Sequence, residues 1–254
     1  MTWRFENTGV HHGSFNMQYD ETLATSVLNG TSNPTVRVYA WDPPAISLGW
    51  SQSEAEVDIR KAMAERIDVV RRPTGGRAIL HADELTYSVV MPAGGRNTMA
   101  VYDHISRALV HGLKEFGVDA KLEKRQVYFP AEYVKASSAA CFTSTARFEI
   151  LVAGKKLVGS AQRRYSKKNG EEVVLQHGSI LLDSRHKRIA EFLRVSETER
   201  ILLQKELEDR TTDLSSLLGR HLSFDEIADA VRTGFEEEWH INFERVSEPL
   251  SIAS

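Results

Sequence analysis

The order of short apolar runs is the feature that most limits what this 254-residue chain can fold into. Up to about residue 183, runs such as 36–41, 45–50 and 85–91 follow one another closely, with few helical stretches between them. Such runs are typical of β-strands, and a regular βαβ array would place a helix after each of them. The order therefore predicts an α+β fold, with a mixed, mostly antiparallel sheet flanked by helices.

Helical periodicity occurs at a few places within this strand-rich region. Residues 15–28 carry apolar side chains at helical spacing, with Ser14 as a candidate N-cap, and residues 58–66 and 103–116 also read as helices. Further strands are expected at residues 67–72, 78–80, 148–152, 156–161, 172–175 and 178–182. The pair of strands around Gly154 has the composition of a hairpin that presents two lysines near its tip.

From about Ser184 onward the pattern becomes helical and charged. Helices are expected at residues 186–193, 197–207, 212–218 and 223–239, and the last begins with the capping box Ser223-Phe-Asp-Glu226. The charges along residues 197–208 are typical of a solvated helix face, and a docking surface for a partner is the alternative. We therefore divide the chain into a core at residues 1–183 and a helical C-terminal segment at 184–254 that packs on the core.

Composition argues against several classes of protein. The formal net charge of −3 gives no bias toward nucleic acid or a membrane surface. No stretch approaches the roughly eighteen apolar residues of a transmembrane helix, and the N-terminus lacks the apolar segment of a signal peptide. Cys141 is the only cysteine, so an intrachain disulfide is excluded and a reducing compartment is favoured. We expect a cytoplasmic protein that binds neither nucleic acid nor membranes.

Paired glycines follow one of the predicted strands, in the run Arg71-Arg-Pro-Thr-Gly-Gly-Arg77. Gly75 and Gly76 let a backbone turn tightly and approach a ligand, while Arg72 and Arg77 could offer forked donors. The plainer alternative is a β-turn with solvated arginines, because glycine is common in turns. The run has neither the Gly-Lys-Ser/Thr ending of a Walker loop nor the third glycine of a dinucleotide fingerprint.

Cys141 precedes Lys156 by fifteen positions. A thiolate is the reactive form of cysteine, and a nearby ammonium group stabilises it. The alternative is a small buried hydrophobe, which is how a free cysteine usually behaves. Small and polar neighbours such as Ala140 and Thr143 favour a loop that a substrate can approach. Adjacent strand residues face opposite ways, so Lys155 is expected to be solvated if Lys156 points inward.

Four segments, taken in chain order, resemble the superfamily of lipoate-protein ligases, octanoyltransferases and biotin ligases. Asn16-Met-Gln-Tyr-Asp-Glu21 is similar to its N-terminal helix motif, and the run from Arg71 to Ser88 is similar to its Arg-Arg-x-x-Gly-Gly segment with a following histidine. Lys156-Leu-Val-Gly-Ser-Ala161 resembles its lysine strand. Gln176-His-Gly-Ser-Ile-Leu-Leu182 resembles the His-Gly-Ser/Thr strand that follows.

The position of the cysteine in the sequence indicates which branch of the superfamily the chain resembles. The superfamily's ATP-dependent ligases form an acyl-adenylate and need no cysteine, whereas its octanoyltransferases pass the acyl chain through a cysteine thioester. In the ligase-like branch of octanoyl-carrier-protein:protein N-octanoyltransferases the cysteine precedes the lysine strand, as Cys141 precedes Lys156. The chain resembles that branch most closely. Two departures from the common motif are Arg77, in place of a third glycine, and Ala82, which separates His81 from the next acidic residue.

The resemblance implies an activity in protein lipoylation. Cys141 would take the octanoyl group from the phosphopantetheine thioester of an acyl carrier protein, and a lysine of the glycine-cleavage H protein or another lipoyl domain would accept it. Lys156 would favour the thiolate and stabilise the oxyanion. No ATP, metal or other cofactor is implied, since octanoyl-phosphopantetheine arrives activated on the carrier. The implied substrate-binding residues are Arg72, Gly75, Gly76, Arg77, Ala78, His81, Gly159, Ser160, His177 and Gly178.

Other functions stay open at this point. An ATP-dependent lipoate or octanoate ligase, an amidotransferase between lipoyl domains, and a non-catalytic binding module would all fit the same scaffold. For His81 and His177 the alternative is a structural histidine whose hydrogen bonds are satisfied within the protein. No group of His, Cys and carboxylate residues has zinc-ligand spacing. The candidates for steering an acidic carrier protein are Arg163, Arg164, Lys167 and Lys168.

Overall fold

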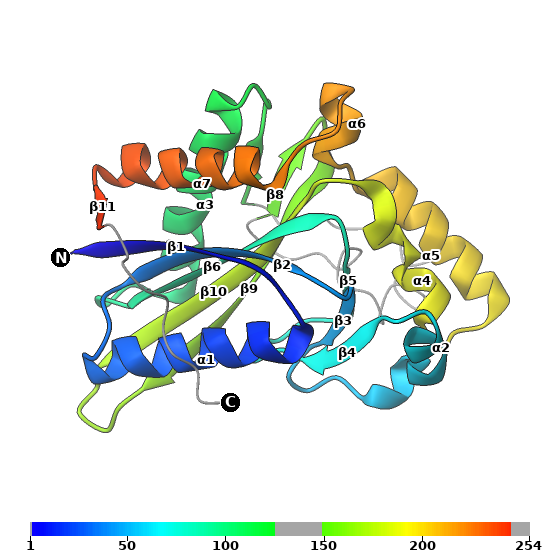
Figure 1. Ribbon diagram of the computed structural model, residues 1–254, viewed down its shortest axis with the longest axis horizontal. Coiled ribbons are helices and arrows are strands. Elements are labelled where there is room, and N and C mark those ends of the chain that lie inside the picture. The colour runs from blue at the N-terminus through cyan, green and yellow to red at the C-terminus, as the bar shows by residue number, and fades with distance from the viewer. Residues whose placement is uncertain (1, 125–148, 245–254) are drawn as a thin grey trace.

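The computed structural model describes residues 2–124 and 149–244 (Figure 1). The strands of its larger sheet are β1 (Trp3–His11), β2 (Thr35–Trp41), β6 (Glu84–Pro92), β7 (Lys121–Glu123), β8 (Glu149–Val152), β9 (Lys155–Ser166), β10 (Glu172–Leu181) and β11 (Phe243–Glu244). Their order in the described ranges is β11-β1-β2-β6-β10-β9-β8-β7. Strand β1 is parallel to β2 and β11, and the other neighbours are antiparallel.

A smaller sheet and two layers of helices complete the core. The smaller sheet has the order β4-β3-β5, from β3 (Ala45–Leu48), β4 (Asp68–Arg71) and β5 (Ile79–His81). The helices are α1 (Gly13–Asn29), α2 (Ile59–Ala64), α3 (Thr98–Glu115), α4 (Ile189–Phe192), α5 (Glu197–Arg210), α6 (Leu214–Leu218) and α7 (Phe224–Trp239), with 3-10 turns η1 (Glu54–Glu56) and η3 (Ser184–Arg188). The predicted fold class, α+β with a mixed, mostly antiparallel sheet flanked by helices, is confirmed. None of the helices within the described ranges has the length and apolar character to cross a membrane.

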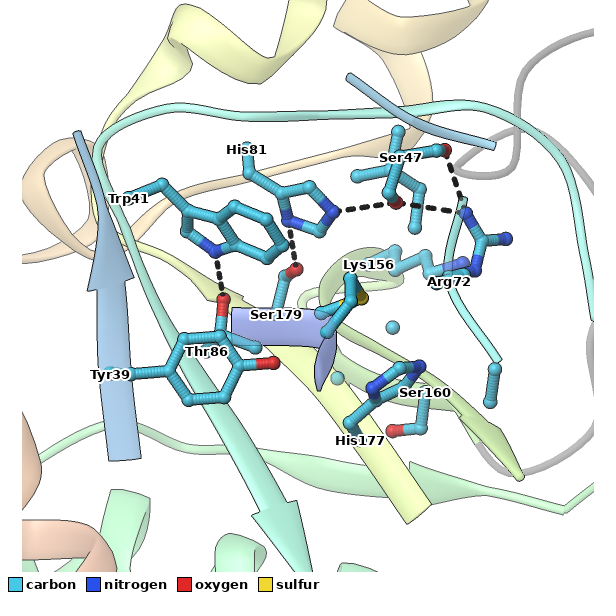
Figure 2. A pocket seen from close by; sticks show the side chains of 15 residues that line it. Tyr39, Trp41, Ser47, Arg72, His81, Thr86, Lys156, Ser160, His177 and Ser179 are labelled. Atoms are coloured by element: carbon cyan, nitrogen blue, oxygen red, sulfur yellow. Dashed lines mark hydrogen bonds between the residues drawn. The ribbon is translucent and has the colours of Figure 1, made fainter. Parts of the chain in front are cut away.

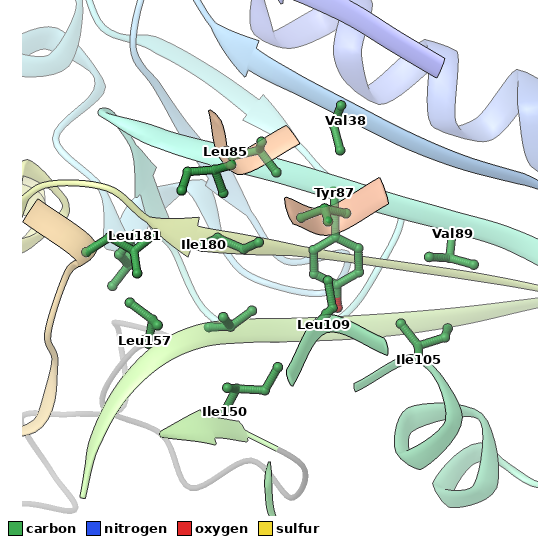
Figure 3. Packing of buried hydrophobic residues seen from close by; sticks show 14 of the residues in the cluster. Val38, Leu85, Tyr87, Val89, Ile105, Leu109, Ile150, Leu157, Ile180 and Leu181 are labelled. Atoms are coloured by element: carbon green, nitrogen blue, oxygen red, sulfur yellow. The ribbon is translucent and has the colours of Figure 1, made fainter. Parts of the chain in front are cut away.

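Strand β6 is buried on both faces, which places it at the centre of the molecule. Leu85, Tyr87 and Val89 pack into one apolar cluster with residues of α3 and α7 (Figure 3). Val90 packs with α1 in a second cluster. Because strand side chains alternate between faces, Thr86 lies on the α1 side with Val90. The α3 face of β6 is therefore apolar, whereas its α1 face carries polar groups that solvent does not reach.

Helix α1 is capped differently from the prediction. Its N-cap is His12, whose Nδ1 accepts a hydrogen bond from the amide of Phe15 at 3.2 Å. Ser14 lies inside the first turn, and its hydroxyl is 2.8 Å from the same ring nitrogen of His12. The prediction of Ser14 as the N-cap is therefore wrong. Serine is a preferred N-cap residue and histidine is not, so residue type alone favours the serine two positions after His12.

Two predictions of strands also need correction. The strands expected at 172–175 and 178–182 are one continuous strand, β10, because Gln176 and His177 are buried and paired with both β6 and β9. Strand β1 was not predicted, since polar residues such as Glu6 and Asn7 interrupt its apolar pattern. Polar residues interrupt both patterns, but Glu6, Gln176 and His177 face the protein interior rather than water.

The C-terminal helices pack against the core. Ile227, Val231 and Phe235 of α7 share the apolar cluster with α3. The two helices approach closely, because a Cβ built at Gly234 would lie 2.3 Å from the carbonyl oxygen of Ala108, so only glycine fits there. The predicted capping box at the start of α7 is confirmed, with Ser223 as its N-cap. The division at residues 183 and 184 stays a prediction.

Candidate active site

A pocket forms where the α1 face of the larger sheet meets the smaller sheet (Figure 2). Seven of the predicted site residues line it, namely Arg72, His81, Lys156, Gly159, Ser160, His177 and Gly178. Apolar and aromatic side chains form another part of its wall, from Met17, Tyr39, Trp41 and Ile79. Residues from α1, from both sheets and from the loop after β4 therefore converge on one space.

Alternation along β10 explains how histidine comes to line this pocket. Val173 and Leu175 pack in the apolar cluster beneath α1. His177 and Ser179 follow at the same two-residue spacing, so they lie on the same face of the strand. Thr86 of β6 is the cross-strand partner of Ser179, and it lines the pocket beside it. One face of the sheet thus changes from an apolar core to a polar wall within a few residues.

His81 is fixed by contacts on both ring nitrogens and on its ring face. Nδ1 lies 2.7 Å from Oε1 of Glu84, and Nε2 lies 2.7 Å from the hydroxyl of Ser47. The ring stacks on Trp41 with a centroid distance of 4.1 Å and an interplanar angle of 11° (Figure 2). Because an ionised carboxylate only accepts hydrogen bonds, Nδ1 donates to Glu84. These contacts meet the requirement for a satisfied structural histidine in the pocket wall.

Glu84 stays ionised although it is buried. Burial alone would raise its pKa, but the interaction with His81 and the hydroxyl donors of Thr86 and Ser179 lower the pKa below its usual value. Thr86 donates at 2.5 Å and Ser179 at 2.7 Å, both to Oε1. The indole Nε1 of Trp41 donates to the Thr86 hydroxyl at 2.7 Å. The carboxylate therefore organises the wall behind His81.

His177 has the same pattern of partners as His81. Its Nδ1 lies 3.1 Å from Oδ2 of Asp20, and its Nε2 lies 2.6 Å from the hydroxyl of Thr74. Burial lowers the pKa of His177 below its usual value, so the ring is neutral near pH 7. Nδ1 then donates to the carboxylate, and Nε2 accepts from Thr74. His177 thereby ties the loop that contains Thr74 to helix α1.

Asp20 is compensated by a buried cation. Arg37 donates to its Oδ1 at 2.8 Å, and both side chains are fully buried. Ser88 donates to the same oxygen, and Tyr39 donates to Oδ2. Burial alone would raise the pKa of Asp20, but the hydrogen bond from His177 and the charge of Arg37 lower the pKa below its usual value. Asp20 is therefore a buried anion behind His177 and Tyr39, which line the pocket.

Arg72 braces the glycine loop from inside. Its Nη1 donates to the main-chain oxygen of Ser47 at 2.8 Å, and its Nη2 donates to the main-chain oxygens of Gly75 and Arg77 at 2.9 and 2.8 Å. The residue is only 3% exposed. The alternative of solvated arginines is therefore wrong for Arg72. Its forked donors serve the protein's own loop, although its side chain still lines the pocket.

The glycine loop lies against the end of β3. A Cβ built at Gly49 would lie 2.0 Å from the carbonyl oxygen of Gly76, so glycine is required for this approach. The amide of Trp50 donates to the main-chain oxygen of Thr74 at 2.9 Å. Gly75 and Gly76 are themselves exposed. The loop is thus held at its base and open at its tip.

Lys156 points inward from the start of β9. The residue is 4% exposed and lines the pocket, and its Nζ donates to Oε1 of Glu149 at 2.6 Å. Lys155, one position earlier, is exposed, and its Nζ donates to the main-chain oxygen of Glu208. The predicted hairpin and the opposite orientation of the two lysines are therefore confirmed.

The remaining predicted residues lie elsewhere. Cys141 lies outside the described residues, so its role stays a prediction. Within the described chain, Gly75, Gly76, Arg77 and Ala78 do not line the pocket. Ala78 packs in the main apolar cluster, while the other three belong to the loop beside the pocket. Their predicted contact with substrate remains untested.

Sequence reasoning missed three buried charged residues behind the pocket lining, namely Asp20, Arg37 and Glu84. Asp20 was noticed only as part of a helix motif. The sequence did contain a signal for Arg37. This residue interrupts an otherwise apolar and aromatic strand, and a charge in such a strand requires a buried partner. In the sequence, Glu84 lies between the strands predicted at 78–80 and 85–91. No sequence spacing connects it to Ser179, which lies 95 positions away.

The site combines an apolar wall with a buried ammonium group and hydrogen-bonded histidines. Met17 and Ile79 give the pocket an apolar surface of the kind that an acyl chain contacts. The Lys156 ammonium can stabilise negative charge that develops at a carbonyl oxygen. In residues 2–124 and 149–244 no group of three or more His, Cys, Asp and Glu side chains could hold a metal ion. Since Cys141 lies outside these ranges, the expected lack of a metal stays a prediction.

Comparisons with known proteins agree on one family. The model of the lipoyl protein ligase A/B catalytic domain matches residues 12–236. Octanoyltransferase LipM of Kyrpidia tusciae is 40% identical over 242 residues, which cover 93% of this chain and 86% of that protein. Octanoyltransferase LipM of an Exiguobacterium species is 37% identical over 249 residues, which cover 96% of this chain and 88% of that protein.

Solved structures share the fold. A bipartite lipoate protein ligase from Thermoplasma acidophilum has a TM-score of 0.77 at 24% identity, covering 97% of this chain and 87% of that one. A lipoate-protein ligase A bound with ATP has a TM-score of 0.74 at 24% identity, covering 97% of this chain and 89% of that one. The fold is therefore that of the lipoate protein ligases. With the family model and the relatives above, this chain belongs to the lipoyl protein ligase A/B catalytic domain family.

Proposed function

We propose that this chain is an acyltransferase that moves an octanoyl group from an acyl carrier protein to a lysine of a lipoyl domain, through a thioester on Cys141. Octanoyl transfer for protein lipoylation rests on the curated octanoyltransferases, which are 33–40% identical to this chain. The carrier-protein donor and the thioester on Cys141 are the further content of the proposal.

The reaction proceeds in two acyl transfers. The Cys141 thiolate attacks the carbonyl carbon of the octanoyl thioester, a new S–C bond forms, and the phosphopantetheine thiolate leaves and takes up a proton. The neutral ε-amine of the acceptor lysine then attacks the acyl-enzyme. An amide forms, the amine loses a proton, and the Cys141 thiolate is regenerated. Each step passes through a tetrahedral oxyanion, which the Lys156 ammonium stabilises.

The observation that carries this proposal is the inward orientation of Lys156 in a pocket with an apolar wall. An octanoyl chain is apolar and would contact Met17, Trp41 and Ile79, while its carbonyl needs a cationic group nearby. Lys156 supplies that group at the end of a rigid hairpin. Its buried position also suits stabilisation of a thiolate, because charges interact more strongly away from water.

Partners, cofactors and location follow from the same chemistry. The acceptor is a lipoyl domain, such as that of the glycine-cleavage H protein or a dehydrogenase. No ATP and no metal are required, because the thioester donor is already activated. We place the reaction in the cytoplasm, with the core at residues 1–183 and the helical segment at 184–254 as its packed extension.

Mass spectrometry of the intact protein tests this proposal. The wild-type chain is incubated with octanoyl-carrier protein in the absence of ATP, and its mass is expected to rise by one octanoyl group. The Cys141→Ser variant is expected to show no labile adduct under the same conditions. A wild-type chain that is never acylated without ATP, but modifies a lipoyl domain when octanoate and ATP are added, is a ligase and overturns the proposal.

A further inference from the structure

Lys156 is held by a carboxylate of the neighbouring strand. The Nζ of Lys156 lies 2.6 Å from Oε1 of Glu149, and the side chains are only 5% and 14% exposed. A charge-assisted hydrogen bond at this distance is short and directional. Because both groups are largely removed from water, loss of one partner would leave the other poorly compensated. The pair is therefore unlike an exposed ion pair, which contributes little.

Strand register places Glu149 within reach of Lys156. Leu151 of β8 is directly opposite Lys156 of β9. Glu149 precedes Leu151 by two positions, so it lies on the same face and diagonal to the lysine. Diagonal neighbours in an antiparallel pair are close enough for long side chains to meet. Ile150 pairs with Val158, so the register shifts here and Leu157 is the extra residue on β9.

The main chain of Lys156 is fixed as well. Its carbonyl oxygen accepts a hydrogen bond from the amide of Thr212 at 3.0 Å, and the residue forms an isolated parallel bridge with Thr211. The hairpin turn itself has Ala153 and Gly154 with φ of 49° and 79°, a pair of positive values typical of a tight two-residue turn. The backbone of the lysine is therefore rigid. The direction of its ammonium group then depends on the contacts of the side chain.

A second carboxylate faces Glu149 across the sheet. Glu123 of β7 is the direct cross-strand partner of Glu149, so the two acidic residues share one face. Like charges directly opposite each other destabilise a strand pair. The ammonium of Lys156 on the same face offsets this repulsion. The contact between Glu149 and Lys156 thus stabilises the pairing of β7 with β8 and also holds the ammonium group at the pocket.

We propose that Glu149 is a positioning residue that holds the Lys156 ammonium in the pocket for acyl transfer. This inference rests on the proposed function. A lysine side chain has many rotamers, and an ammonium group that samples them stabilises an oxyanion less well than one held in place. Glu149 acts through Lys156 and does not itself touch the acyl group. The carboxylate is needed for its charge and its reach, so glutamine at this position is a poor replacement.

Steady-state kinetics with three variants test the inference. Glu149→Gln keeps the shape but removes the charge, and Glu149→Asp keeps the charge with a shorter reach. Glu6→Gln is the matched control, because Glu6 forms a largely buried ion pair at 2.7 Å with Arg4 and is not among the residues that line the pocket. The measured quantities are kcat and KM for octanoyl-carrier protein, with the melting temperature of each variant.

Glu149→Gln is expected to lower kcat for acyl transfer about 10- to 100-fold, the range expected for a misplaced catalytic group, with KM changed less than about twofold. Glu149→Asp is expected to recover part of the lost kcat. Glu6→Gln is expected to keep wild-type kcat. A Glu149→Gln variant with wild-type kcat overturns the inference. The inference is also overturned if Glu149→Asp recovers no activity and the activity of the variants falls in proportion to the amount of folded protein.

The proposed function fails in a different way from this inference. If the wild-type chain forms no octanoyl adduct on Cys141, the function is wrong whatever the Glu149 variants do. If the wild-type chain is acylated and Glu149→Gln is acylated equally fast, the function stands and the positioning role is wrong.

Discussion

His81 and His177 enter the same pocket with matching contacts, yet their carboxylate partners are stabilised in different ways. Each ring places Nδ1 against a carboxylate and Nε2 against a hydroxyl. Asp20, the partner of His177, has a fully buried ion pair with Arg37. Glu84, the partner of His81, has hydroxyl donors instead, and its Oε2 has no hydrogen-bond partner among the described residues.

The difference separates a part of the pocket that is backed by a buried arginine–carboxylate pair from a part whose carboxylate has hydroxyl donors and His81 as partners. The guanidinium of Arg37 also donates to the main-chain and side-chain oxygens of Asn16 and lies over the ring of Tyr39 at 3.8 Å. The Asp20 side therefore couples α1 to β2 through a buried charge pair. On the Glu84 side, His81 and the hydroxyl donors stabilise the carboxylate, so Glu84→Gln leaves no buried arginine without its anion.

Removing the buried cation is the largest expected perturbation. Arg37→Met leaves Asp20 as a buried carboxylate without its cation, and breaking such a pair costs about 3–5 kcal/mol of unfolding free energy. Glu84→Gln removes a carboxylate that has no buried arginine partner, and we expect a smaller loss of about 1–3 kcal/mol. Urea denaturation of both variants measures the difference.

Equal losses in Arg37→Met and Glu84→Gln would contradict the comparison. A larger loss in Glu84→Gln would show that the hydroxyl donors, rather than the ion pair, dominate the stability of the pocket wall. The slope of the unfolding curve must stay unchanged for the comparison to hold, since a changed slope reports a different unfolded or native state.

A third buried histidine, His186, sharpens the comparison because a hydroxyl and a main-chain oxygen face its ring. The ring nitrogens of His186 face the hydroxyl of Thr211 and the main-chain oxygen of Asp183. Burial lowers the pKa of His186 from 6.5 to about 4. Below pH of about 6.5 the unfolded chain takes up a proton that the folded chain does not, so this histidine destabilises the fold progressively down to about pH 4.

His186→Gln is therefore expected to remove part of the acid sensitivity. The shift in pKa corresponds to roughly 3 kcal/mol of unfolding free energy lost by the wild type between about pH 6.5 and pH 4. The variant lacks this contribution, so its curve of stability against pH is flatter in that window, whatever its stability at pH 7. Parallel curves for the variant and the wild type would contradict the assignment.

Much of the fold followed from sequence because apolar periodicity reports which faces are buried. The period of α3 and the composition around Gly154 predicted the correct elements. The failures share a cause. Glu6 in β1 and Gln176 in β10 are polar but buried, and a pattern of residue types cannot distinguish a polar interior from solvent.

The site was predictable to the extent that its residues lie in short motifs. Lys156, His81 and His177 were found in this way, and the structure brings them to one pocket. The contacts that hold them were not predictable, because they join positions far apart, such as His177 and Asp20, which are 157 residues apart in the chain. Glu149 was missed although it lies only seven positions before Lys156, because the contact depends on strand register rather than on a motif.

The most direct measurement of the central claim is a chase of the isolated acyl-enzyme. Wild-type protein is octanoylated by carrier protein, freed of the carrier, and mixed with an unmodified lipoyl domain without ATP. We predict that the octanoyl group leaves the peptide containing Cys141 and appears as an amide on a lysine of the lipoyl domain. An acyl-enzyme that persists unchanged while the lipoyl domain stays unmodified would contradict the claim that Cys141 carries the transferred group.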